Sequence, residues 1–319
     1  MKAKRILAAI ILALSAVTVS SNVSAEQPAA EEYRQMFRSG TFYVEYQISR
    51  KSGGHTFKSG NMVLAGQDGK RMYRITNAGS TKGSSGAEFD VESLSGIYNN
   101  SSLNRRIISY EEFKVKKWPD VLYQDGKYYR FITSGPKAEV RESAFSSLFG
   151  KSKQVVASVL PEDQLNSPVL DPNEEWNYVR EDLALPDELA VFAWKDPFRD
   201  NFFDLPAPAY ENSSKKTVDD KEYDCDRYIT EIKNLAGDVA AQEIYDMLYE
   251  NGKLVLIQKY LKHGDKENFV REFKIKEITA AVPEKTFEIA KKIKVYAAAN
   301  GDMNDMLEKP VEAGTIGGK

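Results

Sequence analysis

The sequence predicts an α+β protein in which two blocks of antiparallel strands flank a more helical centre. Apolar and polar residues alternate along segments in the first and last thirds of the chain, as they do on strands with one buried face. Asp-Gly and Asn-Gly pairs separate several of these segments, and such pairs favour tight hairpins. Between the two blocks, frequent prolines divide the chain into short pieces with helical periodicity.

A segment typical of an export signal precedes the first predicted element. Basic residues open the chain, and an uncharged, mostly apolar run extends from Ile6 to Val19. This run is shorter than the about 20 residues of a membrane-spanning helix, and Val23-Ser24-Ala25 fits the small-x-small cleavage rule. We therefore expect a signal peptide over residues 1–25, cleaved before Glu26, and a periplasmic or secreted bacterial protein without a transmembrane segment. An uncleaved membrane anchor is the alternative.

One helix and three strands are predicted in the first third. Residues 28–38 begin with a proline suited to a first helical turn, and Ser39-Gly40 should stop the helix. Strands are then expected from Phe42 onward and at 58–64 and 70–76. Alternation places one set of apolar side chains on a single face of the first strand: Phe42, Val44, Tyr46 and Ile48.

The centre is mixed and the last third returns to strands. Residues 88–99 fit a weak strand or a short helix, and 114–133 contain strands on either side of Asp125-Gly126. Helix candidates lie at 136–165 (mainly 141–149), 173–182 and 186–195. The later strands are expected at 217–218, 225–232, 242–249, 253–261 and 268–278, with 281–289 ending the sheet.

No internal repeat divides the chain. We expect a single domain over residues 26–299, with an enlarged middle region at about 80–215. The Gly-rich segment 300–319 should be a flexible tail.

Composition argues against several classes of function. The single Cys225 cannot form a disulfide framework or a Cys-rich zinc module, and we expect it to pack as a small hydrophobic strand residue. A net charge of −3 gives no basic surface for nucleic acid. Both histidines, His55 and His263, lie in predicted turns, where a rigid catalytic triad is not expected. We therefore expect no enzyme activity, no metal and no cofactor.

Residues 186–205 combine acidic and aromatic side chains. The carboxylates fit helix caps and solvated surface better than an acid/base pair, and they are Asp187, Glu188, Asp196, Asp200 and Asp204. The aromatic residues are Phe192, Trp194, Phe198, Phe202 and Phe203. One interpretation is a core segment. The other is a mobile apolar flap over a cavity, with Leu189, Phe192 and Trp194 pointing inward.

Two stretches resemble the LolA/LolB-like superfamily of bacterial periplasmic carriers, in an uncharacterised exported branch. They are residues 33–74 (YRQMFRSGTFYVEYQIS … KSGNMVLAGQDGKRMYR) and 245–289 (YDMLYENGKLVLIQKY … REFKIKEITAAVPEKTFEI). The resemblance implies a curved, unclosed antiparallel half-barrel with helices packed on its concave face. In the known carriers that hollow receives the acyl chains of lipoproteins. This chain is longer than those carriers, and their polar ligand-positioning residue is not identified in it.

From the resemblance, we expect a non-catalytic binding or carrier protein for an amphipathic ligand in the bacterial cell envelope. Its partner would be a lipid or a lipidated protein. The alternative is a cell-envelope sensor or protein-interaction module with a filled core, no ligand and a protein partner. The residues expected to line the apolar cavity and its flap are Phe42, Val44, Tyr46, Leu189, Phe192, Trp194, Leu254, Leu256 and Tyr260.

Overall fold

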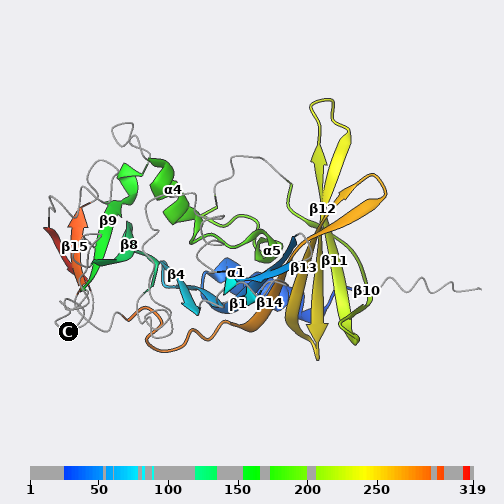
Figure 1. Ribbon diagram of the computed structural model, residues 1–319, viewed down its shortest axis with the longest axis horizontal. Coiled ribbons are helices and arrows are strands. Elements are labelled where there is room, and N and C mark those ends of the chain that lie inside the picture. Colours follow the sequence, from blue (N-terminus) through cyan, green and yellow to red (C-terminus); the bar gives the residue numbers. More distant parts are fainter. Residues whose placement is uncertain are drawn as a thin grey trace, which may run out of the picture.

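A large, curved and unclosed sheet of 14 strands dominates the computed structural model (Figure 1). The residues that the structure describes are 25–52, 55–59, 61–77, 81–82, 88–89, 119–134, 154–165, 173–199, 206–288, 293–297 and 312–316. The strands of the first half are β1 (Phe42–Ser52), β2 (His55–Lys58), β3 (Asn61–Gln67), β4 (Lys70–Asn77), β7 (Val121–Gln124), β8 (Lys127–Ser134) and β9 (Gln154–Pro161). Those of the second half are β10 (Ala209–Val218), β11 (Lys221–Lys233), β12 (Val239–Glu250), β13 (Lys253–His263), β14 (Lys266–Thr279), β15 (Ile293–Ala297) and β16 (Glu312–Ile316).

Three helices accompany the sheet in the part of the chain that the structure describes. They are α1 (Pro28–Ser39), α4 (Asn173–Glu181) and the four-residue α5 (Asp187–Ala190), together with a 3₁₀ turn at Glu162–Gln164. A separate two-stranded ribbon is formed by β5 (Thr81–Lys82) and β6 (Glu88–Phe89). None of the helices among the described residues is long and apolar enough to cross a membrane.

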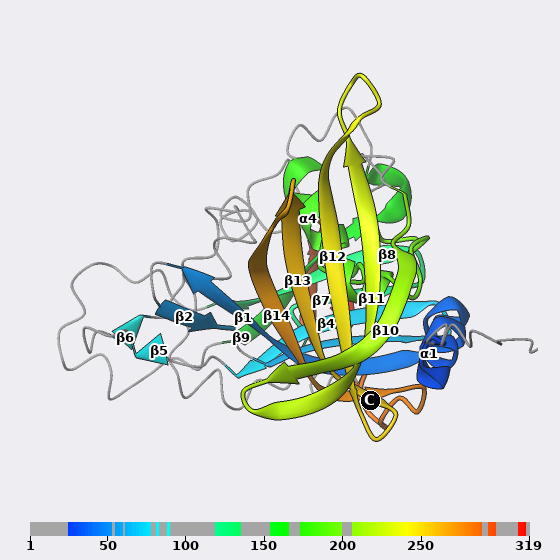
Figure 2. The ribbon, with the colours of Figure 1, turned by 90° about the vertical axis from the view of Figure 1, so that its right-hand side faces the viewer.

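The strand order brings strands from the first and last thirds of the chain into one sheet. It runs β10-β11-β12-β13-β14-β1-β3-β4-β7-β8-β9-β15-β16, with β2 attached to β1. All neighbours are antiparallel except β9 and β15, which are parallel. The pairing of β14 with β1 connects the last third to the first. Figure 2 shows β10–β13 running across the direction of β1 and β4, so that the sheet bends strongly.

Several hairpins follow from local turn chemistry. Asn251 and Gly252 join β12 to β13 with φ angles of 50° and 74°, as a type I′ turn requires. Asp68-Gly69 and Asp125-Gly126 also have positive φ at both residues and join β3 to β4 and β7 to β8. Gly40, with φ 74°, ends α1 in the left-handed region. These predicted turns and helix ends are confirmed.

The helices cover one face of the sheet. On β1, this face carries Phe42, Val44, Tyr46 and Ile48, which are buried together with residues of α1 and α5. We call it the helix-covered face. Helix α4 packs on its continuation over β7–β9, and Tyr73 of β4 contacts both groups of residues. The opposite face carries Tyr43 and a second apolar cluster that extends to β15.

Three segments differ from the sequence-based expectations. Within 136–165, residues 154–161 form β9 rather than a helix, because their apolar residues pair in the sheet. Residues 280–288 contain turns and do not end the sheet. The strands at the edge of the sheet beyond β9 are β15 and β16. The segment expected as a tail contains β16, which pairs with β15. The helix expected at 141–149 lies outside the described residues.

Candidate functional site

Residues 183–199, here called the α5 segment, lie over the helix-covered face. Helix α5 begins after Pro186 and is only one turn long, since Val191 and Phe192 continue in turns toward Pro197. Leu189 and Phe192 are almost completely buried. The ring of Phe192 packs between two rings of α1, with centroids 5.5 Å from Tyr33 and 6.2 Å from Phe37. The segment is thus held to α1 by aromatic contacts.

Most of the residues expected to line an apolar site come together here. They belong to β1, β13 and the α5 segment, and those buried in the shared cluster are Phe42, Val44, Tyr46, Leu189, Phe192 and Leu254. Trp194 is partly buried at the edge of this cluster, with the guanidinium of Arg199 4.3 Å from its ring centroid. These residues are 212 positions apart at their extremes, from Phe42 to Leu254, so only the strand pairing joins them.

Leu256 and Tyr260 do not share this face, contrary to the expectation from alternation. Tyr249 is opposite Leu254 and Leu248 is opposite Leu256, which makes Val255 the extra residue of a β-bulge. The bulge reverses the alternation, so that Leu254 faces the helices and Leu256 packs with Cys225 on the opposite face. Tyr260 also lies there, with its ring 5.7 Å from that of Phe269.

Cys225 is buried in a cluster with Leu248 and Leu256 on the opposite face and packs as a small hydrophobic residue, as the sequence predicts. Burial, reinforced by the negative charge of Asp246, raises the pKa of its thiol to about 12. The thiolate required for nucleophilic chemistry is therefore disfavoured near neutral pH.

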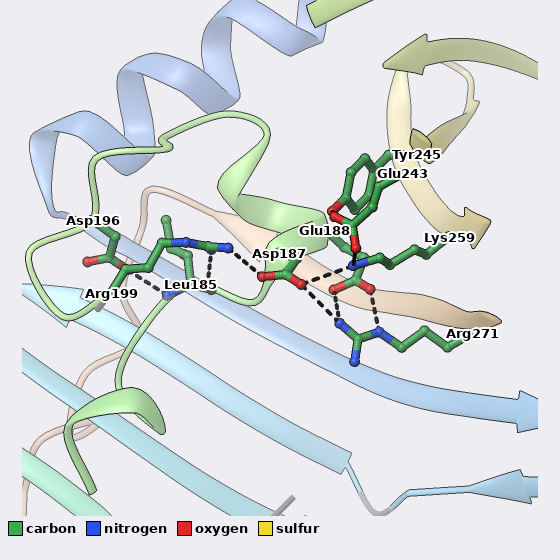
Figure 3. A network of polar contacts seen from close by, with 9 residues as sticks. All are labelled: Leu185, Asp187, Glu188, Asp196, Arg199, Glu243, Tyr245, Lys259 and Arg271. Atoms are coloured by element: carbon green, nitrogen blue, oxygen red, sulfur yellow. Dashed lines mark hydrogen bonds and ion pairs between the residues drawn. The ribbon is translucent and has the colours of Figure 1, made fainter. Parts of the chain in front are cut away.

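A network of charged residues fastens α5 to the sheet (Figure 3). Lys259 of β13 lies with its Nζ 3.0 Å from Asp187 Oδ2 and 2.8 Å from Glu243 Oε1. Arg271 of β14 donates from Nε to Glu188 Oε1 at 2.5 Å and from Nη2 to Glu188 Oε2 at 3.2 Å. The hydroxyl of Tyr245 donates to Glu243 Oε2 at 2.7 Å. The network places charge inside an otherwise apolar interface.

The charges of this network stabilise its ionised form. Burial raises the pKa of Asp187, but Lys259 and Arg199 outweigh that effect and hold its pKa at about 2. Burial lowers the pKa of Arg271, and Glu188 and Asp187 more than compensate, so its pKa is raised overall. Both groups are therefore charged across the physiological range.

A second buried ion pair fixes the other end of the α5 segment. Asp196 lies 3.3 Å from the guanidinium of Arg71 on β4 and accepts hydrogen bonds from the backbone N–H groups of Leu185 (2.5 Å) and Phe198 (3.2 Å). The Arg71 guanidinium lies 4.7 Å from the ring centroids of both Phe42 and Phe198. Burial lowers the pKa of Arg71, against the effect of Asp196.

The expectation of solvated carboxylates is wrong for Glu188 and Asp196. Glu188 is fully buried and Asp196 is 4% exposed, and each is paired with an arginine. Their partners lie 83 and 125 residues away in the chain, so local sequence cannot reveal the pairing. A usable signal is that Lys259 and Arg271 alternate with apolar residues on their strands. Asp200, Asp204, Phe202 and Phe203 lie outside the described residues.

The site consists of paired charges and packed apolar side chains. Within the described part of the chain, no group of three or more His, Cys, Asp or Glu side chains is placed to hold a metal ion. His263 is exposed at the end of β13, and His55 begins β2. Both carboxylates of α5 are paired with cations of the sheet, and the pKa of Asp187 is lowered.

No protein-family model matches the chain, and no curated protein matches it. Among solved structures, it is similar to the crystal structure of a DUF1329 family protein from Desulfovibrio piger. The two chains are 11% identical, and the match covers 82% of this chain and 97% of the other with a TM-score of 0.17. A likeness at this level carries no argument about fold or function.

Proposed function

We propose that this protein is an exported, non-catalytic binding or carrier protein for an amphipathic ligand in the bacterial cell envelope. The observation that supports this is the convergence of Phe42, Val44 and Leu254 beneath Leu189 of a one-turn helix and Phe192 of the turn that follows it. A short helix between breaks can swing away from an apolar surface at a smaller cost than a long packed helix. The helix-covered face would then be the concave face of a half-barrel, and the α5 segment its cover.

Export is part of this proposal. The basic start, the apolar run and Val23-Ser24-Ala25 favour cleavage before Glu26. N-terminal sequencing of protein recovered from the periplasm or medium should begin at Glu26. Recovery of exported protein that retains Met1 would favour the uncleaved anchor.

Binding can be measured through Trp194, which lies at the edge of the apolar cluster. In a variant with Trp118→Phe and Trp176→Phe, titration with a long-chain phospholipid should give a saturable fluorescence change. Phe192→Ala should alter the affinity, because it removes a ring that packs against Tyr33 and Phe37. The matched control is Leu235→Ala, since Leu235 is fully exposed in the β11–β12 turn and should leave the titration unchanged.

The second candidate is a cell-envelope sensor or protein-interaction module with a filled core. The complete burial of Phe42, Val44 and Leu189 favours it, because their surfaces are already covered by the protein itself. Absence of any fluorescence change with phospholipid or lipopeptide, together with full amide-exchange protection of residues 187–195, would support this candidate and contradict the carrier.

A further inference from the structure

Three adjacent strands place basic side chains in a row on the helix-covered face. Lys259 of β13 is directly opposite Arg271 of β14. Arg50 of β1 follows Ser49, which is opposite Glu272, so Arg50 continues the row on the next strand. We call these three residues the basic row. Like charges that lie opposite each other destabilise a sheet, so this arrangement requires anions nearby.

The side chains of the basic row are largely shielded from solvent and lie beside apolar residues. The side chains of Lys259 and Arg271 are 8% and 13% exposed. Burial and the positive charge of Arg271 lower the pKa of Arg50. Glu243 of β12 pairs with Lys259 and offsets part of the positive charge of the row. Burying such charge costs free energy unless a counter-charge is supplied.

The α5 segment supplies counter-charge to the row. Asp187 and Glu188 are adjacent on its first turn and contact Lys259 and Arg271, and Glu188 is fully buried there. Directly beside the row, apolar rings continue along the same face. The Lys259 Nζ is 5.1 Å from the ring centroid of Tyr245, and the Arg271 guanidinium is 5.5 Å from that of Phe273. Phe273 in turn stacks on Tyr46 at 5.4 Å.

We infer that the basic row is the head-group site for an anionic amphiphile. In this conformation the carboxylates of Asp187 and Glu188 occupy the positions that the anionic head group would take. The inference rests on the proposed carrier function and adds the charge of the ligand. When the α5 segment moves away, Lys259, Arg271 and Arg50 receive the anionic head, and the acyl chain lies on the surface that carries Phe273 and Tyr46. Ligand and α5 carboxylates compete for the same cations, so an anionic ligand favours release of the cover.

Competition between lipid and carboxylates gives a direct test with detergent-solubilised dioleoylphosphatidylglycerol and dioleoylphosphatidylcholine as probes. Trp194 reports displacement, because Arg199 contacts both its ring and Asp187. The anionic lipid should bind about tenfold more tightly than the zwitterionic one. Asp187→Asn should strengthen binding of the anionic lipid several-fold, because it weakens the internal competitor at a partly exposed position.

Two variants distinguish a specific effect of the site from a general effect of protein charge and from a loss of folding. Arg271→Gln combined with Glu188→Gln removes both charges of one buried pair, so neither partner of that pair is left as an unpaired charge. It should abolish the preference for the anionic lipid while circular dichroism stays unchanged. Lys215→Gln removes an exposed cation of β10 and should leave both affinities as they are.

The outcomes distinguish the inference from the function on which it rests. Equal binding of both lipids in the wild type, unaffected by the double substitution, would overturn the anionic head-group site and leave the carrier function in place. Absence of binding to either lipid would overturn both. An equal Trp194 response to inorganic phosphate alone would show an anion site that needs no acyl chain, which also contradicts the inference.

The junction where the signal peptide is expected to end lies close to a buried carboxylate. The carboxylate of Asp226 on β11 is buried and accepts a hydrogen bond from the Gln27 backbone N–H at 2.8 Å. It also accepts one from Ser213 Oγ, which itself lies 3.1 Å from the carbonyl oxygen of Ala25. Burial raises the pKa of Asp226, which marks it as a carboxylate with too little compensating charge. The Ala25–Glu26 peptide bond therefore lies beside this buried acid.

We propose that cleavage after Ala25 places the new α-ammonium group of Glu26 against Asp226 and thereby locks the N-terminal segment onto the sheet. Hydrolysis by a peptidase consumes one water and leaves a carboxylate on Ala25 and an ammonium on Glu26. The neighbouring contacts of Glu26 with Arg34 and Tyr228 already hold this residue in position. Maturation would then stabilise α1, the helix that packs on Phe192.

The test compares the cleaved protein with the uncleaved precursor. Asp226→Asn keeps an oxygen that can accept hydrogen bonds but removes the charge, so it should lower the Tm of the cleaved form by several degrees more than that of the precursor. Asp224→Asn on the same strand is the control, since Asp224 is paired with the exposed Lys215. Equal Tm shifts in the two forms, or a mature chain that begins away from Glu26, would overturn this proposal.

Discussion

Neighbouring residues of β1 have opposite environments. Val44 is fully buried beneath the helices, while Glu45 is partly exposed on the other side of the strand, opposite Glu277. The difference arises because successive side chains of a strand point to opposite faces. A charge therefore has very different consequences at these two adjacent positions.

Substitutions at this pair test which face is buried. Val44→Asp should lower the free energy of unfolding by roughly 3–5 kcal/mol, because it introduces an unpaired charge into the apolar cluster. Glu45→Lys should change it by less than about 0.5 kcal/mol. Urea denaturation measures both, and equal losses would show that the register of β1 is wrong.

The Arg71–Asp196 pair gives a second residue-scale prediction. Asp196→Ala leaves the buried Arg71 without its carboxylate and should cost about 3–5 kcal/mol of unfolding free energy. Combining it with Arg71→Met should recover part of this loss, since no buried charge is then unpaired. A double variant that is less stable than Asp196→Ala alone would contradict this account of the pair.

At the scale of elements, the stability of α5 comes from its ion pairs and packing more than from its own helical hydrogen bonds. One helical turn contributes little stability by itself, so the ion pairs of Asp187 and Glu188 and the packing of Leu189 must hold it. The same element is the cover in the proposed function. Conditions that discharge its carboxylates should therefore release it before the sheet unfolds.

Acid titration tests this dependence. The pKa of Asp187 is lowered from 3.8 to about 2, so its contribution to stability is fully present above the ordinary pKa and is lost as the pH falls toward 2. Trp194 fluorescence should change between about pH 4 and pH 2 while the β-sheet circular dichroism is retained. Asp187→Asn should remove or weaken that transition, and an unaltered transition in this variant would assign it to another group.

At the scale of the molecule, the sheet depends on contacts between distant parts of the chain. β14 pairs with β1, and β15 pairs in parallel with β9, which adds the C-terminal strands β15 and β16 to the far edge. Ile293 and Val295 of β15 are buried in the cluster on the opposite face of the sheet, with Phe131 and Ala157. The end of the chain thus contributes to the core.

Substitution in β15 tests this contribution. Ile293→Ala should lower the free energy of unfolding by about 2–4 kcal/mol, since a buried side chain is replaced by a cavity. Thr315→Ala, at an exposed position of the neighbouring β16, should change it by less than about 0.5 kcal/mol. Thermal or urea denaturation separates the two, and a silent Ile293→Ala would show that β15 does not belong to the folded core.

Local patterns were sufficient for the elements and turns that depend on neighbouring residues. The start of α1 at Pro28, its end at Gly40 and the Asn251-Gly252 hairpin follow from backbone preferences within a few positions. Alternation likewise predicted that Phe42, Val44 and Tyr46 share a buried face. The same reasoning failed at Leu256 and Tyr260, because the bulge at Val255 is set by the pairing with β12.

The sequence by itself determined the largely antiparallel character of the strands, the principal hairpins and most of the apolar residues of the candidate site. Only the tertiary structure decided that Glu188 meets Arg271, that Asp196 meets Arg71, and that β15 joins β9. The physical reason is the distance along the chain over which each kind of interaction acts. Turn and strand preferences act between neighbours in the chain, whereas ion pairs and strand partners are selected by the shared burial of residues that the fold brings together.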